Sequence, residues 1–314
     1  MERAIAELRE RGNATPAEFD QAEVNACIDR LSVTTFLRHG RYINRVAKML
    51  HALNIIEENP FSSICNWSND AEKALRSTRA SRRRDVWDDK IFALFNSAVY
   101  QGGCEDPGEP LFWAPLIARF EGMREEEILQ LGVDDFGVED GIDYVSIHDG
   151  GKNRVKSEAA IRKIPVHPAL VKLGLLDLVA LRRAQGQSRL FPHLPRGETK
   201  GTFTEVFTKR FGYYRKTNNC YWPGRDFHSF RTTVNGDLMN STCKDSIRRR
   251  LMGHEPLDAG EKHYAQGLKI STLYEDICKI EVDISMIKSP FDKGKTETEM
   301  NASTAGLRLV ASNG

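Results

Sequence analysis

Helical periodicity runs through most of this chain, and it restricts the possible folds more than any other feature of the sequence. Apolar residues recur every three or four positions within the segments 5–8, 24–31, 43–53, 87–98, 111–117, 170–182 and 227–239. Alternation typical of a half-buried strand occurs only at 142–147 and 162–167, with a hairpin excursion expected at 148–161. The acidic stretch 133–141 predicts a loop. These patterns predict a mainly α protein with a small antiparallel β-sheet, an α+β fold.

Length and composition predict two domains. A chain of 314 residues is long enough for two hydrophobic cores. Residues 1–68 contain enough helical spacing for a small helical domain, and the polar, basic residues 69–86 are typical of an interdomain linker. We expect residues 87–284 to form the larger domain and residues 285–314 to form a polar C-terminal tail.

Composition also argues against several classes of protein. No run of about 18 uninterrupted apolar residues occurs, and the charged N-terminal segment does not resemble a secretory signal. The six cysteines never form a CxxC pair, and the eight histidines show no HExxH spacing. We therefore expect a cytoplasmic protein with free thiols, without a membrane partner, and without a metal ion or other cofactor.

The distribution of charge tells more than its sum, because the formal net charge is only +1. Basic residues gather at 73–84, 200–216 and 244–250, whereas acidic residues gather at 105–109 and 121–143. Such segregation favours one surface that faces phosphates, although any single cluster taken alone is more often a solvated helix face. The candidates for DNA contact are Arg82, Arg83, Arg84, Lys209, Arg210 and Arg215.

A set of chemically matched side chains occurs between residues 228 and 264. His228 and Arg231 are three residues apart, so on a helix both would project from one face. His254 and Tyr264 follow within the next 33 residues. Displacement at a phosphodiester needs fixed cations around the phosphate oxygens, which arginine forks such as Arg231 and the upstream Arg124 provide. It also needs a nucleophile, a base and an acid, for which we assign Tyr264, His228 and a lysine of the hairpin.

Five short motifs occur in order along the chain. They are Gly122-Met123-Arg124 followed by Glu127 and Leu131, Lys156-Ser157 ahead of Ile164-Pro165-Val166-His167-Pro168, His228-Ser229-Phe230-Arg231, Leu251-Met252-Gly253-His254, and Tyr264. Together they resemble the motifs of tyrosine recombinases of the phage integrase family. The resemblance covers about residues 87–282, and the joint order of the motifs is far more specific than any one of them.

The resemblance implies a site-specific recombinase, or integrase, of a mobile element. Such an enzyme cleaves and rejoins DNA through a 3′-phosphotyrosyl intermediate and uses neither metal nor ATP. The implied catalytic residues are Arg124, Lys156, His228, Arg231, His254 and Tyr264, with Glu127 in support. By the same resemblance the arginines and His254 hold the phosphate, His228 transfers a proton, and Lys156 protonates the leaving oxygen. The implied partner is double-stranded DNA, bound by a homotetramer on paired sites with accessory DNA-bending proteins.

Some alternatives stay open at the level of sequence. Lys152 is a second candidate for the acid, although Lys156 lies at the better distance from the strand that follows. Tyr274 is a rival nucleophile, although its apolar spacing favours packing. Glu127 could be one of three solvated acids on a helix. The short N-terminal region also leaves room for a DNA-binding accessory protein without turnover, and related chemistry occurs in type IB topoisomerases.

Overall fold

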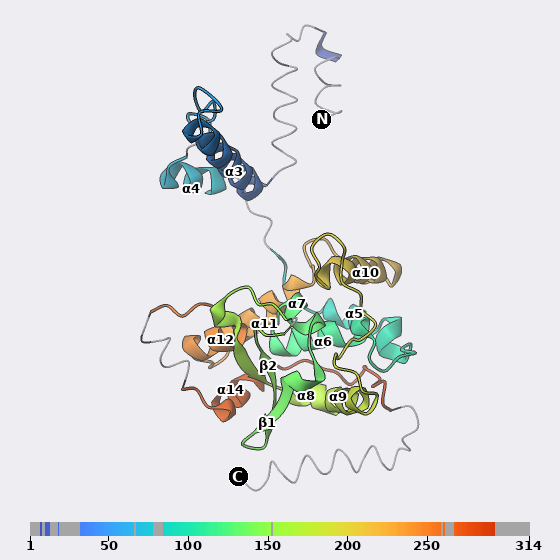
Figure 1. The fold of residues 1–314 in the computed structure, drawn as a ribbon. Helices are drawn as coiled ribbons and strands as arrows, with labels where there is room; N and C mark the ends of the chain where they lie inside the picture. The colour runs from blue at the N-terminus through green and yellow to red at the C-terminus, as the bar shows by residue number, and fades with distance from the viewer. Residues whose placement is uncertain are drawn as a thin grey trace. The chain divides into compact units, whose positions relative to one another are not determined.

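The computed structural model describes residues 7, 10–12, 18, 32–65, 67–77, 84–151, 153–258, 260 and 267–292. The chain divides into two compact units, Met1–Arg83 and Arg84–Gly314 (Figure 1). Among the residues that are described, no helix combines the length and the apolar character needed to cross a lipid bilayer.

The smaller unit contains helix α3 (Val33–Ala52) packed on helix α4 (Asn69–Ser77). Helix α3 begins at Ser32, whose hydroxyl accepts a hydrogen bond from the Thr35 backbone N–H at 3.1 Å. Helix α4 occupies the first half of the stretch that the composition predicts to be a linker. Its start is marked by Ser68, whose hydroxyl accepts from the Ala71 N–H at 3.2 Å, so a local capping signal outweighs the polar composition.

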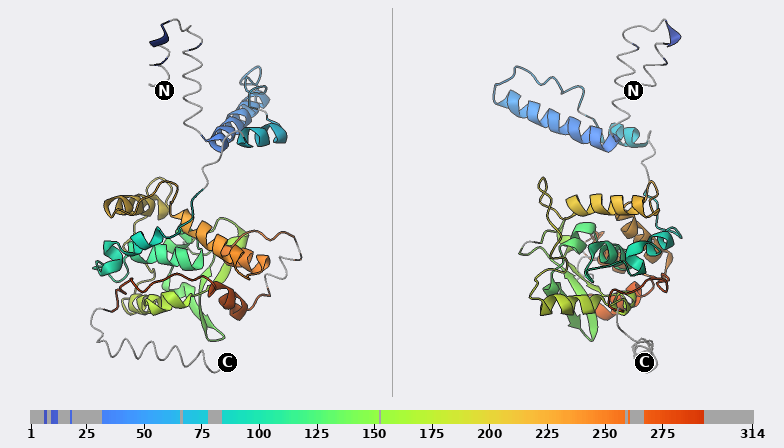
Figure 2. Two further views of the ribbon diagram at one scale, coloured as in Figure 1. Left: turned by 180° about the vertical axis from the view of Figure 1, so that it is seen from behind. Right: turned by 90° about the vertical axis from the view of Figure 1, so that its right-hand side faces the viewer.

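The larger unit is built from short helices around one hydrophobic core. The helices are α5 (Ile91–Phe95), η1 (Ala98–Gln101), α6 (Pro110–Glu121), α7 (Glu125–Leu129), η2 (Val133–Asp135), η3 (Glu158–Ala160), α8 (Pro168–Lys172), α9 (Leu175–Ala184), α10 (Thr204–Thr217), α11 (His228–Asn240), α12 (Asp245–Met252) and α14 (Ile270–Ile277). Helix α10 lies along the upper edge of this unit in every view (Figures 1 and 2). Helix α6 is buried along its whole length and packs against α11 and α8.

Helix α6 tolerates a proline in its interior because another side chain replaces the missing hydrogen bond. Pro115 has no N–H to donate to the carbonyl of Leu111. That carbonyl instead accepts from the Tyr100 hydroxyl at 3.1 Å. The helix then ends at Gly122, which adopts the left-handed conformation with φ of 63° and turns the chain into α7.

The β-sheet has three antiparallel strands in the order β1 (Phe136–Glu139), β2 (Ile142–Ile147) and β3 (Arg162–Pro165). Phe136 pairs with Val145 in the first hairpin, and helix α14 packs against β2 and β3. The predicted strands at 142–147 and 162–167 are confirmed, and so is the α+β fold class. The prediction of a loop at 133–141 is wrong, because η2 and β1 occupy most of it.

Two other expectations differ from the structure. The helix predicted at 170–182 is two helices, because Gly174 adopts φ of 91° between α8 and α9. Part of the expected C-terminal tail belongs to the packed unit. The Gln101 amide donates to the Met286 carbonyl at 2.9 Å, and the Ser289 hydroxyl donates to the Leu173 carbonyl at 2.8 Å. These contacts hold residues 285–292 against the core of their own chain.

Candidate active site

Arg124 stands at the start of α7, directly after the turn that ends α6. Its Nη1 donates to Glu127 Oε1 at 2.6 Å, and its Nη2 donates to the carbonyl of Gly253 at 2.9 Å. Its backbone N–H also donates to Glu127 Oε2 at 2.9 Å. The side chain stays 22% exposed. Arg124 is therefore fixed in position while its guanidinium remains accessible.

Glu127 lies behind Arg124 and is only 3% exposed. Its carboxylate also accepts from the fully buried Arg162, whose Nη2 lies 3.0 Å from Oε2. Burial alone would raise the pKa of Glu127, but the charges and hydrogen bonds of Arg162 and Arg124 outweigh it and lower the pKa to about 2. The alternative that Glu127 is a solvated acid on a helix surface is wrong.

Arg231 projects from α11 into the interior and is 5% exposed. Its Nη1 donates to the carbonyl of Gly122 at 2.7 Å, and its Nη2 donates to the carbonyl of Met252. Burial, followed by the charges of Arg124 and Arg162, lowers the pKa of Arg231 to about 9, which still leaves it protonated at neutral pH. Arg231 thus joins the ends of α6 and α12.

Two left-handed glycines make this arrangement possible. Gly253 has φ of 59°, and a Cβ there would lie 2.7 Å from Nη1 of Arg162. Gly122 has φ of 63°, and a Cβ there would lie 2.8 Å from the sulfur of Met252. A side chain at either position would strain the left-handed backbone and clash with its neighbour, so both turns require glycine. In these turns the Gly253 carbonyl accepts from Arg124 and the Gly122 carbonyl accepts from Arg231.

The two histidines lie at the ends of neighbouring helices. His228 is the first residue of α11 and is exposed, and His254 is half-buried directly after Gly253. Desolvation, followed by the charges of Arg84 and Arg231, lowers the pKa of His228. Burial, followed by the charge of Arg231, lowers the pKa of His254 to about 4. Both imidazoles are therefore neutral at pH 7, able to accept one proton and to donate one hydrogen bond.

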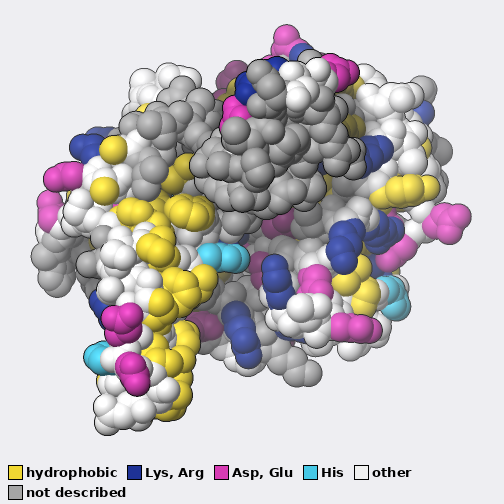
Figure 3. Space-filling model, turned by 90° about the horizontal axis from the view of Figure 1, so that it is seen from above, with side chains coloured by type: hydrophobic (Ala, Val, Ile, Leu, Met, Phe, Trp, Pro, Cys, Tyr) yellow, Lys and Arg dark blue, Asp and Glu magenta, His cyan; other side chains and the backbone are white. Residues whose placement is uncertain are grey.

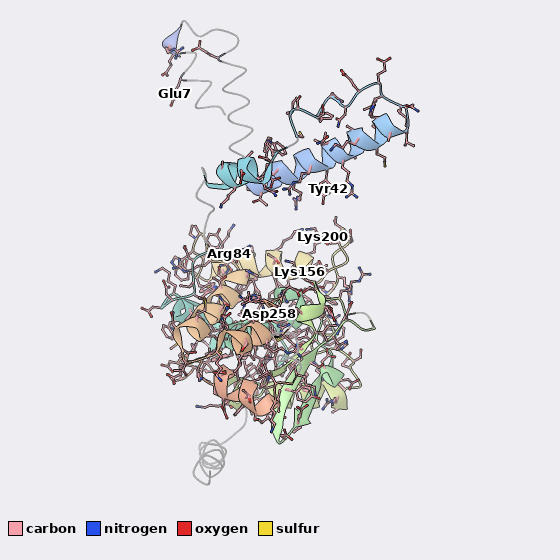
Figure 4. The ribbon with its side chains drawn as sticks, turned by 90° about the vertical axis from the view of Figure 1, so that its left-hand side faces the viewer. Glu7, Tyr42, Arg84, Lys156, Lys200 and Asp258 are labelled. Carbon is pink, nitrogen blue, oxygen red and sulfur yellow. The ribbon has the colours of Figure 1, made fainter. Side chains whose placement is uncertain are left out.

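Lys156 is exposed on the loop that joins β2 to η3. It lies on the same upper edge of the larger unit as Arg84 and Lys200 (Figure 4). Lys152, its rival, and Tyr264 both fall outside the described residues. The rival nucleophile Tyr274 is half-buried on α14, and burial together with Cys278 raises its pKa. These properties fit a packing role for Tyr274.

The candidates for DNA contact have different surroundings. Arg84 and Arg210 are exposed and form ion pairs with Asp226 at 2.9 Å and Glu109 at 2.8 Å, and Lys209 is also exposed. Arg82 and Arg83 lie outside the described residues. Arg215 is only 5% exposed and its guanidinium lies 4.7 Å from the ring of Phe211. This burial argues against the direct DNA contact that the sequence predicts for Arg215.

Helix α3 carries a basic face that the sequence reasoning did not single out. Arg38, Arg41, Arg45 and Lys48 are all exposed, and their spacing of three and four residues places them on one side of the helix. The helix also exposes apolar side chains, those of Tyr42, Ile43, Val46, Met49 and Leu53. Seen from above, hydrophobic side chains gather at the lower left of the space-filling view (Figure 3). The helical spacing of the four cations was the available signal.

Arg162 is a further residue that the sequence reasoning missed. Besides Glu127, its side chain donates to the carbonyl of Leu251 at 2.8 Å and to that of Ala160 at 2.7 Å. A charged residue inside a buried strand was the available signal, since such groups are rarely buried without partners. Arg162 connects the sheet to α7 and α12 beneath the site.

Comparisons with known proteins establish the fold. No protein-family model and no curated protein match the sequence. The structure is similar to that of the Tn1549 transposon integrase in complex with circular intermediate DNA, at 13% identity, with 87% of this chain and 97% of that chain covered and a TM-score of 0.50. A solved integrase from mycobacterium phage Brujita matches at 17% identity over 86% of this chain and 77% of that one, with a TM-score of 0.42. The Tn1549 likeness shows that the chain has an integrase fold.

Proposed function

We propose that this chain is a site-specific DNA recombinase that cleaves and rejoins DNA through a 3′-phosphotyrosyl intermediate on Tyr264. The observation that carries the proposal is the arginine pair, Arg124 and Arg231. Each guanidinium is bonded to the backbone at the end of α12, and a buried Glu127–Arg162 pair lies behind Arg124. In an integrase fold, such a pair suits the non-bridging oxygens of a scissile phosphate.

The arginine pair is suited to a transition state because it is fixed before DNA arrives. A guanidinium has five N–H donors, and the side-chain bonds from Arg124 to Glu127 and Gly253 use two of them. The remaining donors can meet phosphate oxygens without reorganisation of the site. Preorganised donors of this kind stabilise developing negative charge more than mobile ones do.

Proton transfer in the proposed reaction follows from the states of the ionisable groups. The Tyr264 oxygen attacks phosphorus and its proton passes to His228, which is neutral because its pKa is lowered. The bond from phosphorus to the 5′-oxygen breaks, and the Lys156 ammonium gives that oxygen a proton. Attack by another 5′-hydroxyl on the phosphotyrosine reverses these transfers and restores the tyrosine. The number of phosphodiester bonds is conserved, so no external energy source is required.

Partners follow from the same proposal. Double-stranded DNA would meet the upper edge of the larger unit, where Arg84 and Lys156 lie, and the basic face of α3. A homotetramer on paired sites, with accessory DNA-bending proteins, is what the sequence resemblance implies. Phosphate contacts position a protein on DNA without reading its sequence, so these residues do not define the target site.

Covalent trapping tests the proposal directly. Nicked suicide substrates taken from DNA flanking the gene should yield an adduct with the wild-type protein that survives SDS. Tyr264→Phe should abolish the adduct, because it removes the hydroxyl that is assigned to attack phosphorus. Tyr274→Phe is the matched control and should retain it.

Three results would contradict this assignment. Loss of the adduct only in Tyr274→Phe would move the nucleophile. No adduct with wild-type protein on any flanking DNA would favour an accessory DNA-binding protein. Relaxation of supercoiled DNA without any paired site would favour a topoisomerase.

A further inference from the structure

The loop that carries Lys156 is hydrogen-bonded to the C-terminal end of helix α7. The side chain of Gln130 makes two hydrogen bonds to one residue of this loop, Arg154. Its Oε1 accepts from the Arg154 N–H at 3.0 Å, and its Nε2 donates to the Arg154 carbonyl at 3.1 Å. Gln130 itself is 5% exposed and ends helix α7. Two bonds to one backbone unit fix its position and its orientation.

A second contact holds the beginning of the same loop. Asp135 is 8% exposed, and its Oδ1 lies 2.7 Å from Nε2 of His148. Its other oxygen accepts from the Gly132 N–H at 2.7 Å and lies 3.5 Å from the amide nitrogen of Asn153, the outer limit of a hydrogen bond. The loop is therefore bonded at residue 148 and at residues 153–154.

Gln130 is connected to the arginine site through helix α7. Helix α7 has Arg124 as its first flanking residue and Gln130 as its last, and Gln130 N–H donates to the Glu126 carbonyl at 3.1 Å. Arg154 lies two residues from Lys156 and two residues from Lys152. A displacement of α7 relative to the loop would therefore move either candidate acid relative to Arg124.

We propose that Gln130 and Asp135 are positioning residues, which hold the lysine-bearing loop in register with Arg124 so that its ammonium can reach the leaving 5′-oxygen. This rests on the proposed function, because it assumes that the lysine acts as an acid. Neither residue touches DNA in this scheme. Misplacement of a reacting group by about 1 Å costs on the order of 10²-fold in rate. Loss of the two hydrogen bonds between Gln130 and Arg154 should therefore slow DNA cleavage measurably.

A change of leaving group separates positioning of the acid from general damage. Gln130→Ala should slow adduct formation on ordinary DNA by about 10-fold to 100-fold. It should leave cleavage of a 5′-bridging phosphorothiolate near the wild-type rate, because a thiolate needs little protonation to depart. Lys156→Ala should show the same selectivity, and the double variant should be no slower than Lys156→Ala. If the phosphorothiolate restores cleavage in Lys152→Ala and not in Lys156→Ala, then Lys152 is the acid. Gln130 would keep the same positioning role in that case.

Gln101→Ala is the matched control. Its side-chain amide also donates to two backbone carbonyls, those of Phe95 at 3.0 Å and Met286 at 2.9 Å, but it holds the C-terminal segment. It should affect both substrates equally. An equal loss on both substrates for Gln130→Ala would overturn the positioning role. Gln130→Glu keeps the acceptor for the Arg154 N–H and loses the donor, so it should fall between wild type and Gln130→Ala.

Native-state proteolysis measures the attachment of the loop without any catalysis. Arg154 and Lys156 are both exposed trypsin sites. Gln130→Ala should speed cutting after these two residues, and Gln101→Ala should not. Unchanged cutting in Gln130→Ala would overturn the inference even if the recombinase is active. If Gln130→Ala is cut faster but the wild-type protein forms no adduct, the attachment of the loop by Gln130 is supported and the proposed function is rejected.

Discussion

At the scale of single residues, burial rather than sequence position decides how the charged groups behave. Glu121 and Glu127 are six residues apart, and both are buried. Glu127 has two arginine partners, which lower its pKa to about 2. Glu121 has only partial compensation from the His167 backbone N–H and from Arg162, so burial raises its pKa to about 8. One carboxyl is ionised at neutral pH, and the other is largely protonated.

Glu121 predicts a specific dependence of stability on pH. Its folded pKa of about 8 lies above the usual value of 4.5, so the folded state keeps a proton that the unfolded state releases. The free energy of unfolding should therefore fall as pH rises from about 4.5 to 8. Glu121→Gln removes this titration, so its free energy of unfolding should change less between these pH values. At pH 8 the variant should gain a few kcal/mol of stability at most, since one pKa unit corresponds to about 1.4 kcal/mol.

Urea unfolding of both proteins between about pH 5 and 8.5 checks this prediction. The comparison isolates residue 121 because every other titrating group is shared. Parallel curves for wild type and Glu121→Gln would show that the carboxyl is not held protonated in the folded state.

At the scale of elements, helix α7 is connected to helix α10 and to strand β3 through three consecutive glutamates. Glu125 accepts from the Thr208 hydroxyl at 2.7 Å. Glu126 accepts from the backbone N–H groups of Phe203 and Thr204, at 3.1 and 2.9 Å, at the start of α10. Glu127 meets the buried arginine of β3. From composition alone these three glutamates would be expected in solvent, but each makes a hydrogen bond or an ion pair to another element of the unit.

Glu126 should act as a cap for helix α10 from a distant part of the chain. Glu126→Ala leaves two backbone N–H groups at the start of α10 without their carboxylate, which should cost about 0.5–2 kcal/mol of stability, as loss of a cap does elsewhere. Hydrogen exchange should quicken at residues 203–206 and stay unchanged at the end of α10. Glu139→Ala is a suitable control, because that carboxylate is partly exposed and pairs with Lys163 on the sheet. Equal exchange in both variants would contradict the capping role.

Helices α6 and α11 and strands β2 and β3 were predicted, helices α10 and α12 were not, and two other misses have local physical causes. Strand β1 was missed although Asp140-Gly141, with φ of 52° and 76°, is a strong signal for a two-residue hairpin turn. The acidic composition of 133–141 obscured it. The split between α8 and α9 at Gly174 was also readable, because glycine readily adopts positive φ. Composition was in both cases a weaker guide than turn residues.

At the scale of the whole molecule, each unit presents its own basic surface. The larger unit places Arg84 and Lys156 on one edge, and the smaller unit has the basic face of α3. Proteins that neutralise phosphates lose affinity as salt rises, in proportion to the number of contacts. The smaller unit should therefore contribute to DNA affinity without any role in the chemistry.

Arg45→Ala tests this contribution. It should weaken DNA binding and reduce the slope of log affinity against log salt by about 0.9, the value for one phosphate contact. Lys172→Ala changes the net charge equally at an exposed position of α8 and should leave the slope unchanged. Titration of labelled duplex DNA at several salt concentrations measures both. If Arg45→Ala and wild type show the same slope of log affinity against log salt, Arg45 does not contact phosphate and α3 is not part of the DNA-binding surface.

The sequence by itself determined the helical periodicity, strands β2 and β3 and the order of the motifs, because these are local patterns in neighbouring residues. It also placed Arg124, His228, Arg231 and His254 in one chemical set. Only the tertiary structure decided which charges are buried and what they bond. The hydrogen bond from Arg124 to the Gly253 carbonyl spans 129 positions, and Arg215 is buried with its guanidinium 5.8 Å from the ring of Trp87, to which no spacing rule connects it. Burial and hydrogen bonding depend on packing between distant segments, and that packing also placed Gln130 beside the loop of Lys156.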